Sequence, residues 1–227
     1  MPASGIITEL VLLDGKPSGR IQCEPLLIPS PGQYLLAYGD ESDSPLAAPV
    51  FSARSFAEGF LAAPPMPTSW TVGAHLNLRG PLGKGFLLPK DARRVALIAF
   101  DECPSRLTAL LDGAVNQEAA ITLVCGTPPD DLPLQVEVQP LNVLADVCQW
   151  ADWIAMDVAR DALPGLWKII RKCNPLITRN GAQILIRTPM PCGALAECSV
   201  CAIEGQRGRL LACKDGPVFD LKDLWQE

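Results

Sequence analysis

Short apolar runs, separated by Pro and Gly residues, fill the first part of the chain up to about residue 89. The clusters of turn residues between these runs and the abundance of Val, Ile and Leu within them are typical of strands. The predicted strands span residues 6–12, 20–27, 33–38, 50–52 and 75–79. We therefore expect residues 1–91 to form an all-β unit, a small antiparallel barrel.

The pattern changes after residue 93, where short, mostly apolar segments alternate with segments whose apolar residues recur at the spacing of an α-helix. Such runs are typical of a parallel sheet covered on both faces. Two helices are predicted. The first is capped by Ser105, and its apolar face consists of Leu107, Leu110, Leu111 and Val115. The second has Pro164 in its first turn, and its apolar face consists of Leu166, Ile169, Ile170 and Cys173. The strands span residues 95–100, 120–124, 134–138, 153–156 and 183–187, so residues 92–187 are expected to form an α/β domain of four or five strands.

Composition and charge narrow the class of protein. The chain has 227 residues, 48% of them hydrophobic, and a net charge of -6, which fits a well-buried globular protein and argues against a nucleic-acid partner. No apolar run is long enough for a membrane span, and no basic region followed by an apolar stretch opens the chain. Nine Cys without such a leader favour a reducing compartment, so we expect a cytoplasmic protein.

Four cysteines lie close together in the last segment, residues 188–227. Cys192, Cys198, Cys201 and Cys213 follow the spacing C-x5-C-x2-C-x11-C, one residue longer in its first gap than the spacing of plant-type [2Fe-2S] ferredoxins. Four thiolates also bind tetrahedral zinc, and free cysteines pack as small hydrophobic side chains. The spacing favours an iron-sulfur cluster and leaves zinc and inert thiols as alternatives.

Three motifs carry a family resemblance. They are Cys213-Lys214-Asp215-Gly216-Pro217-Val218-Phe219, Gly80-Pro81-Leu82-Gly83-Lys84-Gly85-Phe86 and Pro31-Gly32-Gln33-Tyr34. Together with the order of barrel, α/β domain and cysteine segment, they resemble the electron-transfer subunit of bacterial dihydroorotate dehydrogenase, one of the ferredoxin-reductase-like flavoproteins. The resemblance implies a ferredoxin-reductase-like two-domain fold with a C-terminal [2Fe-2S] loop segment. It also implies that Cys192, Cys198, Cys201 and Cys213 ligate the cluster.

The nucleotide sites of that family are only partly matched. The resemblance implies that FAD would contact Phe51, Ser52 and the turn Gly80, Pro81, Leu82 and Gly83, but Pro49 stands where the family has an Arg for the pyrophosphate. FAD is therefore left open, with its absence slightly favoured. The expected Gly-rich turn after residue 99 is replaced by Phe100-Asp101-Glu102-Cys103-Pro104, and the later Cys-Gly-Pro turn by about Met156-Asp157-Val158. Since Asp101 and Glu102 would repel a phosphate, we do not expect NAD(P)H to be a substrate.

The expected function is that of a [2Fe-2S] electron-transfer subunit in a cytoplasmic, flavin-linked oxidoreductase complex, with no catalytic residue of its own. The resemblance implies a hetero-oligomer whose partner is an FMN-containing catalytic subunit or another redox protein, and a place in pyrimidine biosynthesis. Glu197, in the lengthened loop, is predicted to lower the reduction potential of the cluster. The alternative is a structural or assembly subunit with a four-thiolate zinc site and no redox role.

Overall fold

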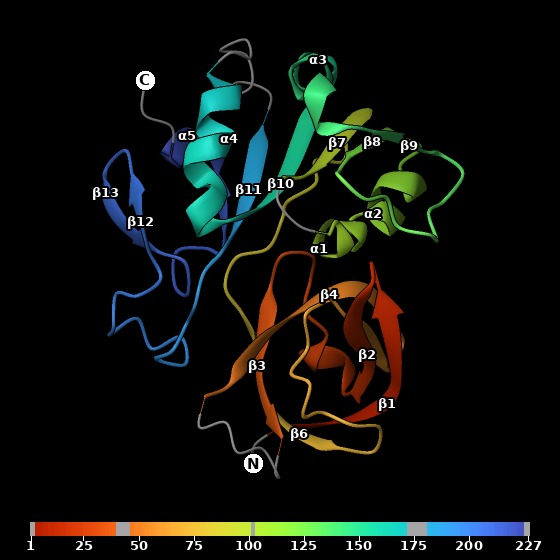
Figure 1. Cartoon of the computed structure of the whole chain (residues 1–227), viewed down its shortest axis with the longest axis vertical. Helices are drawn as coiled ribbons and strands as arrows, with labels where there is room; N and C mark the ends of the chain where they lie inside the picture. Colours follow the sequence, from red (N-terminus) through yellow and green to blue (C-terminus); the bar gives the residue numbers. More distant parts are fainter. Residues whose placement is uncertain (1–2, 40–45, 101–102, 172–180, 225–227) are drawn as a thin grey trace.

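Six antiparallel strands of the first part of the chain close into a barrel, in the order β1-β2-β5-β4-β3-β6. The computed structural model describes residues 3–39, 46–100, 103–171 and 181–224. The barrel strands are β1 (Ala3–Leu13), β2 (Lys16–Cys23), β3 (Tyr34–Gly39), β4 (Ala48–Phe56), β5 (Gly59–Ala62) and β6 (His75–Leu82), with a short 3-10 turn, η1 (Pro25–Leu27), after β2. The expected barrel is confirmed and forms the lower half of the molecule (Figure 1).

One barrel strand, β5, is absent from the prediction. It is only four residues long and precedes a Pro-rich stretch, so the sequence carries almost no strand pattern there. Its first residue has a φ of 145°, and a Cβ added at Gly59 would lie 2.1 Å from the Ile21 carbonyl oxygen of β2. Glycine is required at this position because the backbones of β2 and β5 approach so closely.

The second part of the chain forms a six-stranded sheet in the order β14-β11-β10-β7-β8-β9. Its strands are β7 (Arg94–Ala99), β8 (Ala120–Val124), β9 (Val136–Gln139), β10 (Trp153–Ala159), β11 (Ala182–Arg187) and β14 (Val218–Asp220). Five strands are parallel, as expected from their continuous apolar runs, and β14 pairs antiparallel with β11. All five strands predicted within residues 92–187 are present, and β14, from the cysteine segment, adds a sixth that the sequence analysis did not foresee.

Helices connect the parallel strands. They are α1 (Ser105–Thr108), α2 (Leu111–Asn116), α3 (Leu144–Trp150) and α4 (Leu163–Ile170), with the 3-10 turns η2 (Leu141–Val143) and η3 (Arg160–Ala162) before α3 and α4. Pro164 lies in the first turn of α4, as predicted, whereas the end of the predicted apolar face, Cys173, is outside the described residues. The single helix predicted after Ser105 is divided into α1 and α2. Ser105 does not cap it, because its hydroxyl hydrogen-bonds the Asp14 carboxylate of the β1–β2 turn.

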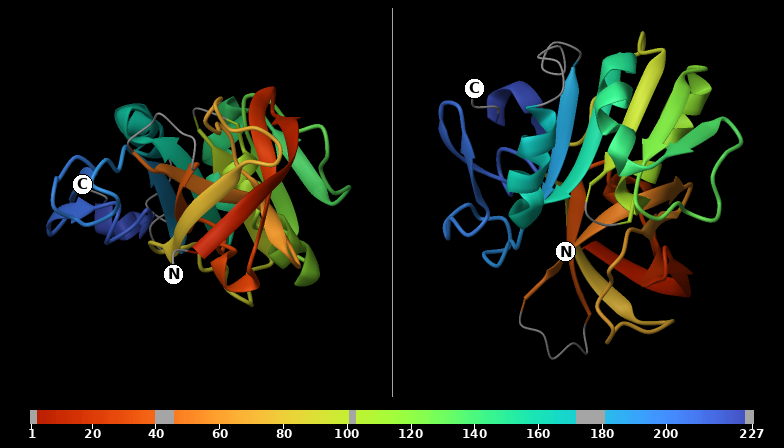
Figure 2. Two further views of the ribbon diagram at one scale, coloured as in Figure 1. Left: turned by 90° about the horizontal axis from the view of Figure 1, so that it is seen from below. Right: turned by 45° about the horizontal axis from the view of Figure 1, so that its top comes forward.

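The C-terminal segment packs against both domains. It contains the two-stranded hairpin β12 (Ala202–Gly205) and β13 (Gly208–Leu211), then β14 and the helix α5 (Leu221–Leu224). Both views in Figure 2 show this segment, in blue, along one side of the molecule. The Lys84 amide donates to the Gly216 carbonyl over 2.6 Å, and the Phe86 amide donates to the Pro31 carbonyl over 2.8 Å. The three motifs singled out in the sequence therefore meet in space.

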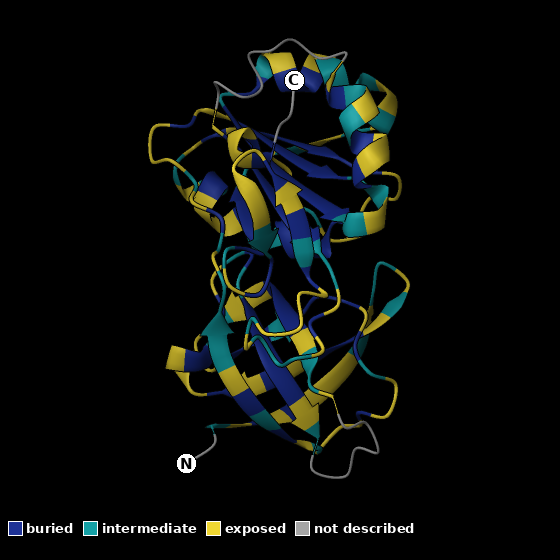
Figure 3. Ribbon diagram, turned by 90° about the vertical axis from the view of Figure 1, so that its left-hand side faces the viewer, coloured by how far each residue is buried: buried dark blue, intermediate teal, exposed yellow. Residues whose placement is uncertain are grey.

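The two domains also share a hydrophobic core. Tyr34, Phe51 and Phe86 belong to the same buried cluster as the sheet residues, while the barrel interior forms a second cluster that contains Ile7 and Phe60. Figure 3 shows the buried sheet strands above the barrel. Among the described residues, no helix is both long and apolar enough to span a bilayer.

Candidate functional site

The four cysteines of the C-terminal motif lie together as two pairs. The Cys198 side chain donates a hydrogen bond to the Cys192 sulfur. The Cys213 side chain donates one to the Cys201 sulfur, and Cys213 is also influenced electrostatically by Cys192. All four are free thiols. The structure thus places the four cysteines near one another as two pairs, but within the described residues no group of three such side chains is formed that could hold a metal ion.

The two pairs differ in their exposure to solvent. Cys201 and Cys213 are 1% and 5% exposed, and we call them the inner pair. Cys192 is half-buried and Cys198 is exposed, and we call them the outer pair. A group held by all four would therefore have one side in the protein interior and one side at the surface.

Backbone N–H groups of the intervening loop point at the outer pair. The amides of Glu197, Cys198 and Leu195 donate to the Cys192 sulfur; the Glu197 amide has the largest effect, and the pKa of Cys192 falls to about 6. The loop can curl in this way because Ala194, Ala196 and Ser199 have positive φ values of 62°, 63° and 55°. Each such non-glycine conformation costs about 1–3 kcal/mol, a strain that is commonly found at functional sites.

The inner pair has the opposite electrostatic character. Burial, followed by the hydrogen bond to Cys201, raises the pKa of Cys213 to about 12. The Ala196 amide acts in the other direction and donates to the Cys213 sulfur. Without a cation, Cys213 is therefore a thiol at neutral pH, and a metal would be needed to hold it as a thiolate.

Two kinds of metal centre take four thiolates. Within the described chain, no group of three or more His, Cys, Asp or Glu side chains is arranged to hold one metal ion. A structural zinc needs four ligands around a single ion, whereas in a [2Fe-2S] cluster each of the two irons takes two thiolates. In the structure the thiols lie as two pairs, and backbone amides donate to Cys192 and Cys213.

Side chains from both domains hold the cysteine segment. Arg79 of β6 donates from Nη1 to the Gly193 carbonyl over 2.8 Å. The Arg160 guanidinium of η3 donates to the Val200 carbonyl. The Tyr34 hydroxyl of β3 donates to the Cys213 carbonyl over 3.4 Å, from a fully buried position. The sequence analysis did not identify these three residues; only Tyr34 belongs to a motif that could have indicated a role.

A pocket of about 600 Å³ lies between the barrel and the α/β domain, at the carboxyl ends of β10 and β11. We call it the interdomain pocket. Ligands commonly bind in this position in open α/β sheets. The barrel side is apolar and includes Pro49, Phe51 and Ala63; the sheet side carries Arg106, Arg160, Arg187 and Thr188. The Thr188 hydroxyl is buried and has no hydrogen-bond partner in the structure.

Two of these arginines share one buried carboxylate. Asp157 is 1% exposed and lies 3.3 Å from Arg106 Nη1 and 2.7 Å from Arg187 Nε. Arg106 also donates to the Pro64 carbonyl of the barrel over 2.6 Å. Asp157 belongs to the stretch that the resemblance matched to the family's Cys-Gly-Pro turn near the nicotinamide. In this protein that stretch carries a network of buried ion pairs. Asp101 and Glu102 lie outside the described residues.

Of the six residues named for FAD, only Phe51 lines the interdomain pocket. Ser52 is buried, and its hydroxyl lies 3.4 Å from that of Ser55. The turn from Gly80 to Gly83 faces the C-terminal segment, because a Cβ added at Gly83 would lie 2.5 Å from Pro217 Cδ. Pro81 and Leu82 belong to the end of β6, in the same turn.

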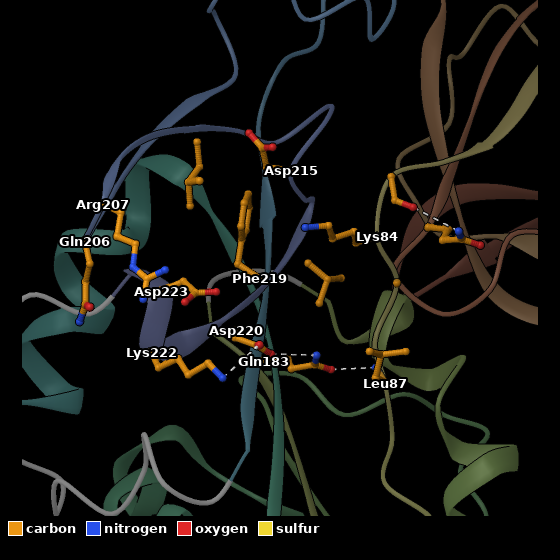
Figure 4. Close-up of a pocket in the computed structure, with 15 residues that line it drawn as sticks. Lys84, Leu87, Gln183, Gln206, Arg207, Asp215, Phe219, Asp220, Lys222 and Asp223 are labelled. Carbon is orange, nitrogen blue, oxygen red and sulfur yellow. Dashed lines mark hydrogen bonds and ion pairs between the residues drawn. The ribbon is translucent and has the colours of Figure 1, made fainter.

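Gly83 lines a different pocket of about 950 Å³, between the domain linker and the C-terminal segment. Figure 4 shows Lys84 and Arg207 on opposite sides of this pocket, with Phe219 between them and Asp215 at the top of the view. The Gln183 side chain also lines this pocket and links Leu87 to Asp220: it accepts from the Leu87 amide over 2.8 Å and donates to the Asp220 carboxylate over 3.1 Å. Charges of both signs line this pocket, so it favours neither a simple anion nor a simple cation.

Solved structures with the same fold are found among flavin-dependent reductases, although no family model matches the chain. A structure from a study of flavin-based electron bifurcation by an NADH-dependent reduced ferredoxin-NADP oxidoreductase has a TM-score of 0.75 at 14% identity, with 97% of this chain and 89% of that one covered. The ferredoxin reductase of carbazole 1,9a-dioxygenase has a TM-score of 0.62 at 14% identity, covering 76% and 65%. Ferredoxin-NADP+ reductase from Plasmodium falciparum has a TM-score of 0.59 at 12% identity, covering 82% and 96%.

At these identities the similarity establishes the fold. The chain has a ferredoxin-reductase-like two-domain fold, which confirms that part of the prediction. What each of these proteins binds or reduces is a property of that protein.

Proposed function

We propose that the protein is an electron-transfer subunit that holds a [2Fe-2S] cluster on Cys192, Cys198, Cys201 and Cys213. One observation carries the proposal: the four thiols form two hydrogen-bonded pairs, and the amides of Leu195, Glu197 and Cys198 converge on the outer one. Such donors stabilise the negative charge of cluster sulfurs. When bound, the cluster would accept and release one electron at a time.

The chain's own residues determine how the cluster would be used. The inner pair and Tyr34 exclude water from one side, while the exposed Cys198 provides an edge that a partner can reach. We propose that the partner is a flavin-containing catalytic subunit of the dihydroorotate-dehydrogenase type, in a cytoplasmic hetero-oligomer. This part of the proposal depends on the motif resemblance.

Substitution of single cysteines tests the ligand set. Replacing Cys192, Cys198, Cys201 or Cys213 by Ser should each abolish the reduced-state electron paramagnetic resonance (EPR) signal of a [2Fe-2S] cluster. Cys125 is also buried, but it follows β8 and should be replaceable without loss of that signal. The ligand set is wrong if the signal persists at full intensity in any of the four variants.

A flavin in the interdomain pocket is a second candidate feature. The apolar side formed by Pro49, Phe51 and Ala63 suits a planar ring, and the arginines opposite suit its phosphate. Denaturing the purified protein should then release a yellow, fluorescent compound in a ratio of about one per chain. A protein purified from flavin-rich cells that releases none contradicts this feature and leaves the cluster proposal intact.

NAD(P)H is not part of the proposed function. The buried ion pairs of Asp157 with Arg106 and Arg187 occupy the sheet edge where the resemblance assigned the nicotinamide site. Adding NADH under anaerobic conditions should therefore leave the visible spectrum of the oxidised protein unchanged. Rapid bleaching by NADH would show that the nucleotide reacts with this subunit.

A further inference from the structure

The pocket of about 950 Å³ between the domain linker and the C-terminal segment is separate from both sites considered above, and we call it the linker pocket. Among the residues that the structure describes, none lines both this pocket and the interdomain pocket, and none of the four cysteines lines it. Its volume is within the range of about 300–1,000 Å³ that is usual for small-molecule sites. The proposed electron-transfer function does not involve this pocket.

Side-chain amides hold the walls of the linker pocket in place. Gln33 of the barrel donates to the Gly83 carbonyl over 3.1 Å. Gln183 of β11 links Leu87 of the domain linker to Asp220 of β14. Contacts within the chain therefore form the pocket, and it does not need a ligand to take its shape, as is usual for binding sites.

Six charged side chains line the linker pocket, and they are Lys84, Arg207, Lys222, Asp215, Asp220 and Asp223. Three of them are engaged within the chain. Asp215 accepts from the Leu211 amide over 2.8 Å. Lys222 lies 3.7 Å from Asp220. The side chains of Lys84, Arg207 and Asp223 are exposed and have no ion-pair or hydrogen-bond partner in the described part of the chain, so they are available to a ligand.

The backbone brings Arg207 and Asp223 close together. The amide of Gln206, the residue before Arg207, donates to the Asp223 carbonyl over 2.8 Å. Lys84 comes from the domain linker instead, and Figure 4 shows it on the opposite side of the pocket from Arg207, with Phe219 between them. The available charges are therefore a pair of opposite signs on one side and a single cation on the other.

This arrangement matches the charges of an acidic α-amino acid. An arginine binds a carboxylate through two parallel N–H donors, and an aspartate accepts hydrogen bonds from an ammonium group. The second carboxylate of such a ligand can then reach the cation across the pocket. Leu87, which is 74% exposed, and the half-buried Leu210 also line the pocket and can contact the methylene groups of the ligand.

We propose that the linker pocket binds an acidic α-amino acid of the glutamate type, with its α-carboxylate at Arg207, its ammonium group at Asp223 and its side-chain carboxylate at Lys84. The site goes beyond the proposed electron-transfer function and uses neither a metal nor a flavin. Lys84 belongs to the domain linker, whereas Arg207 and Asp223 belong to the C-terminal segment. The bound ligand therefore connects these two parts of the chain.

Isothermal titration calorimetry with L-glutamate tests the site. The wild-type protein should show saturable binding. Three analogues should each bind about tenfold more weakly or worse, because each lacks one charged contact. Glutarate has no ammonium group, γ-aminobutyrate has no α-carboxylate, and L-glutamine has no side-chain carboxylate. If L-glutamate gives no saturable heat, or if the analogues bind as tightly, the proposal is wrong.

Single substitutions separate the three contacts. Lys84→Gln should weaken binding of L-glutamate about tenfold and leave binding of L-glutamine unchanged, since L-glutamine has no side-chain carboxylate for this lysine. Arg207→Gln and Asp223→Asn should weaken binding of both. The matched control is Lys90→Gln, because Lys90 is exposed in the domain linker and does not line the pocket. If Lys84→Gln binds L-glutamate as well as Lys90→Gln does, Lys84 does not hold the ligand.

Thermal unfolding provides a second readout, since a ligand that binds only the folded protein raises its stability. L-glutamate should raise the midpoint of unfolding, and glutarate at the same ionic strength should raise it less. Equal effects of the two compounds would indicate a general effect of salt and would contradict the proposal. Neither measurement depends on a cluster, so a negative result here leaves the proposed [2Fe-2S] function intact, and a protein without a cluster signal leaves this site intact.

Discussion

At the scale of single residues, the two cysteine pairs differ because their surroundings differ. Cys192 receives hydrogen bonds from three backbone amides, whereas Cys213 is buried beside a second thiol. The first environment favours a thiolate and the second a thiol. The metal-free protein should therefore present one reactive sulfur to an incoming metal, and the inner sulfurs should lose their protons as the metal binds.

The difference predicts selective alkylation of Cys192 in the metal-free protein. Its pKa is lowered from 9.0 to about 6, so its thiolate is present above that pH and is lost as the pH falls through it. Iodoacetamide labelling of Cys192, followed by mass spectrometry, should reach half of its maximal rate near pH 6. Labelling of Cys192 that rises only near pH 9 would contradict the role of the backbone amides.

Glu197 provides a second test at this scale. Its side chain is exposed and its amide donates to Cys192, so a Glu197→Gln protein keeps the backbone geometry and loses one negative charge beside the site. The reduction potential should become more positive, because the added electron is no longer repelled by this carboxylate. The matched substitution Glu204→Gln on β12, also exposed, should have a smaller effect. If the reduction potential of the Glu197→Gln protein does not rise, the Glu197 carboxylate does not lower the potential of the site.

At the scale of elements, glycines join the barrel to the C-terminal segment. Gly83 has a φ of 74°, and a Cβ there would lie 2.5 Å from Pro217 and 2.7 Å from the Gly216 carbonyl oxygen. Gly32 is in a similar position against Val218. A residue with a side chain does not fit at Gly83, because this turn packs closely against the residues just before β14.

Gly83→Ala should destabilise the protein by about 1–3 kcal/mol, because it adds both a clash and an unfavourable φ. Urea unfolding measures this change, with Gly126→Ala as the control, since a Cβ there would meet nothing within 4 Å. The cluster signal should also weaken, because the turn supports the Cys213 segment. Equal stability of the two variants would show that the contact with Pro217 is dispensable.

At the scale of the whole molecule, a buried carboxylate helps to join the two domains. Asp157 on β10 holds Arg106, whose guanidinium reaches the Pro64 carbonyl of the barrel. A second arginine, Arg187 at the end of β11, completes the network. The two domains are thus connected by charged groups at the same edge where the interdomain pocket opens.

Asp157→Asn should destabilise the protein by about 3–5 kcal/mol, because it leaves two arginines without their buried counter-charge. The matched control is Asp161→Asn, whose side chain is 97% exposed and pairs with Arg160 at 3.9 Å. Thermal unfolding of both variants provides the measurement. If Asp157→Asn is as stable as the control, the network does not hold the domains together.

The sequence predicted the architecture better than it predicted contacts between segments. Apolar runs and turn residues identified five of the six barrel strands, and local spacing correctly placed Cys192, Cys198, Cys201 and Cys213 near one another, whereas their role as ligands stays a prediction. The pattern could not indicate that β14 completes the sheet, because a three-residue strand carries no periodicity. It also gave no sign of the ion pairs of Asp157, since Arg106 and Arg187 lie far from it in the chain. The turn at Gly80 was assigned by resemblance to FAD, whereas its packing against Pro217 depends on tertiary structure.

Metal and sulfide analysis of the anaerobically purified protein tests the central claim most directly. The account predicts about two irons and two acid-labile sulfides per chain, together with a one-electron EPR signal after reduction. A colourless protein with about one zinc per chain and no sulfide would contradict it, and would favour a structural role for the four cysteines.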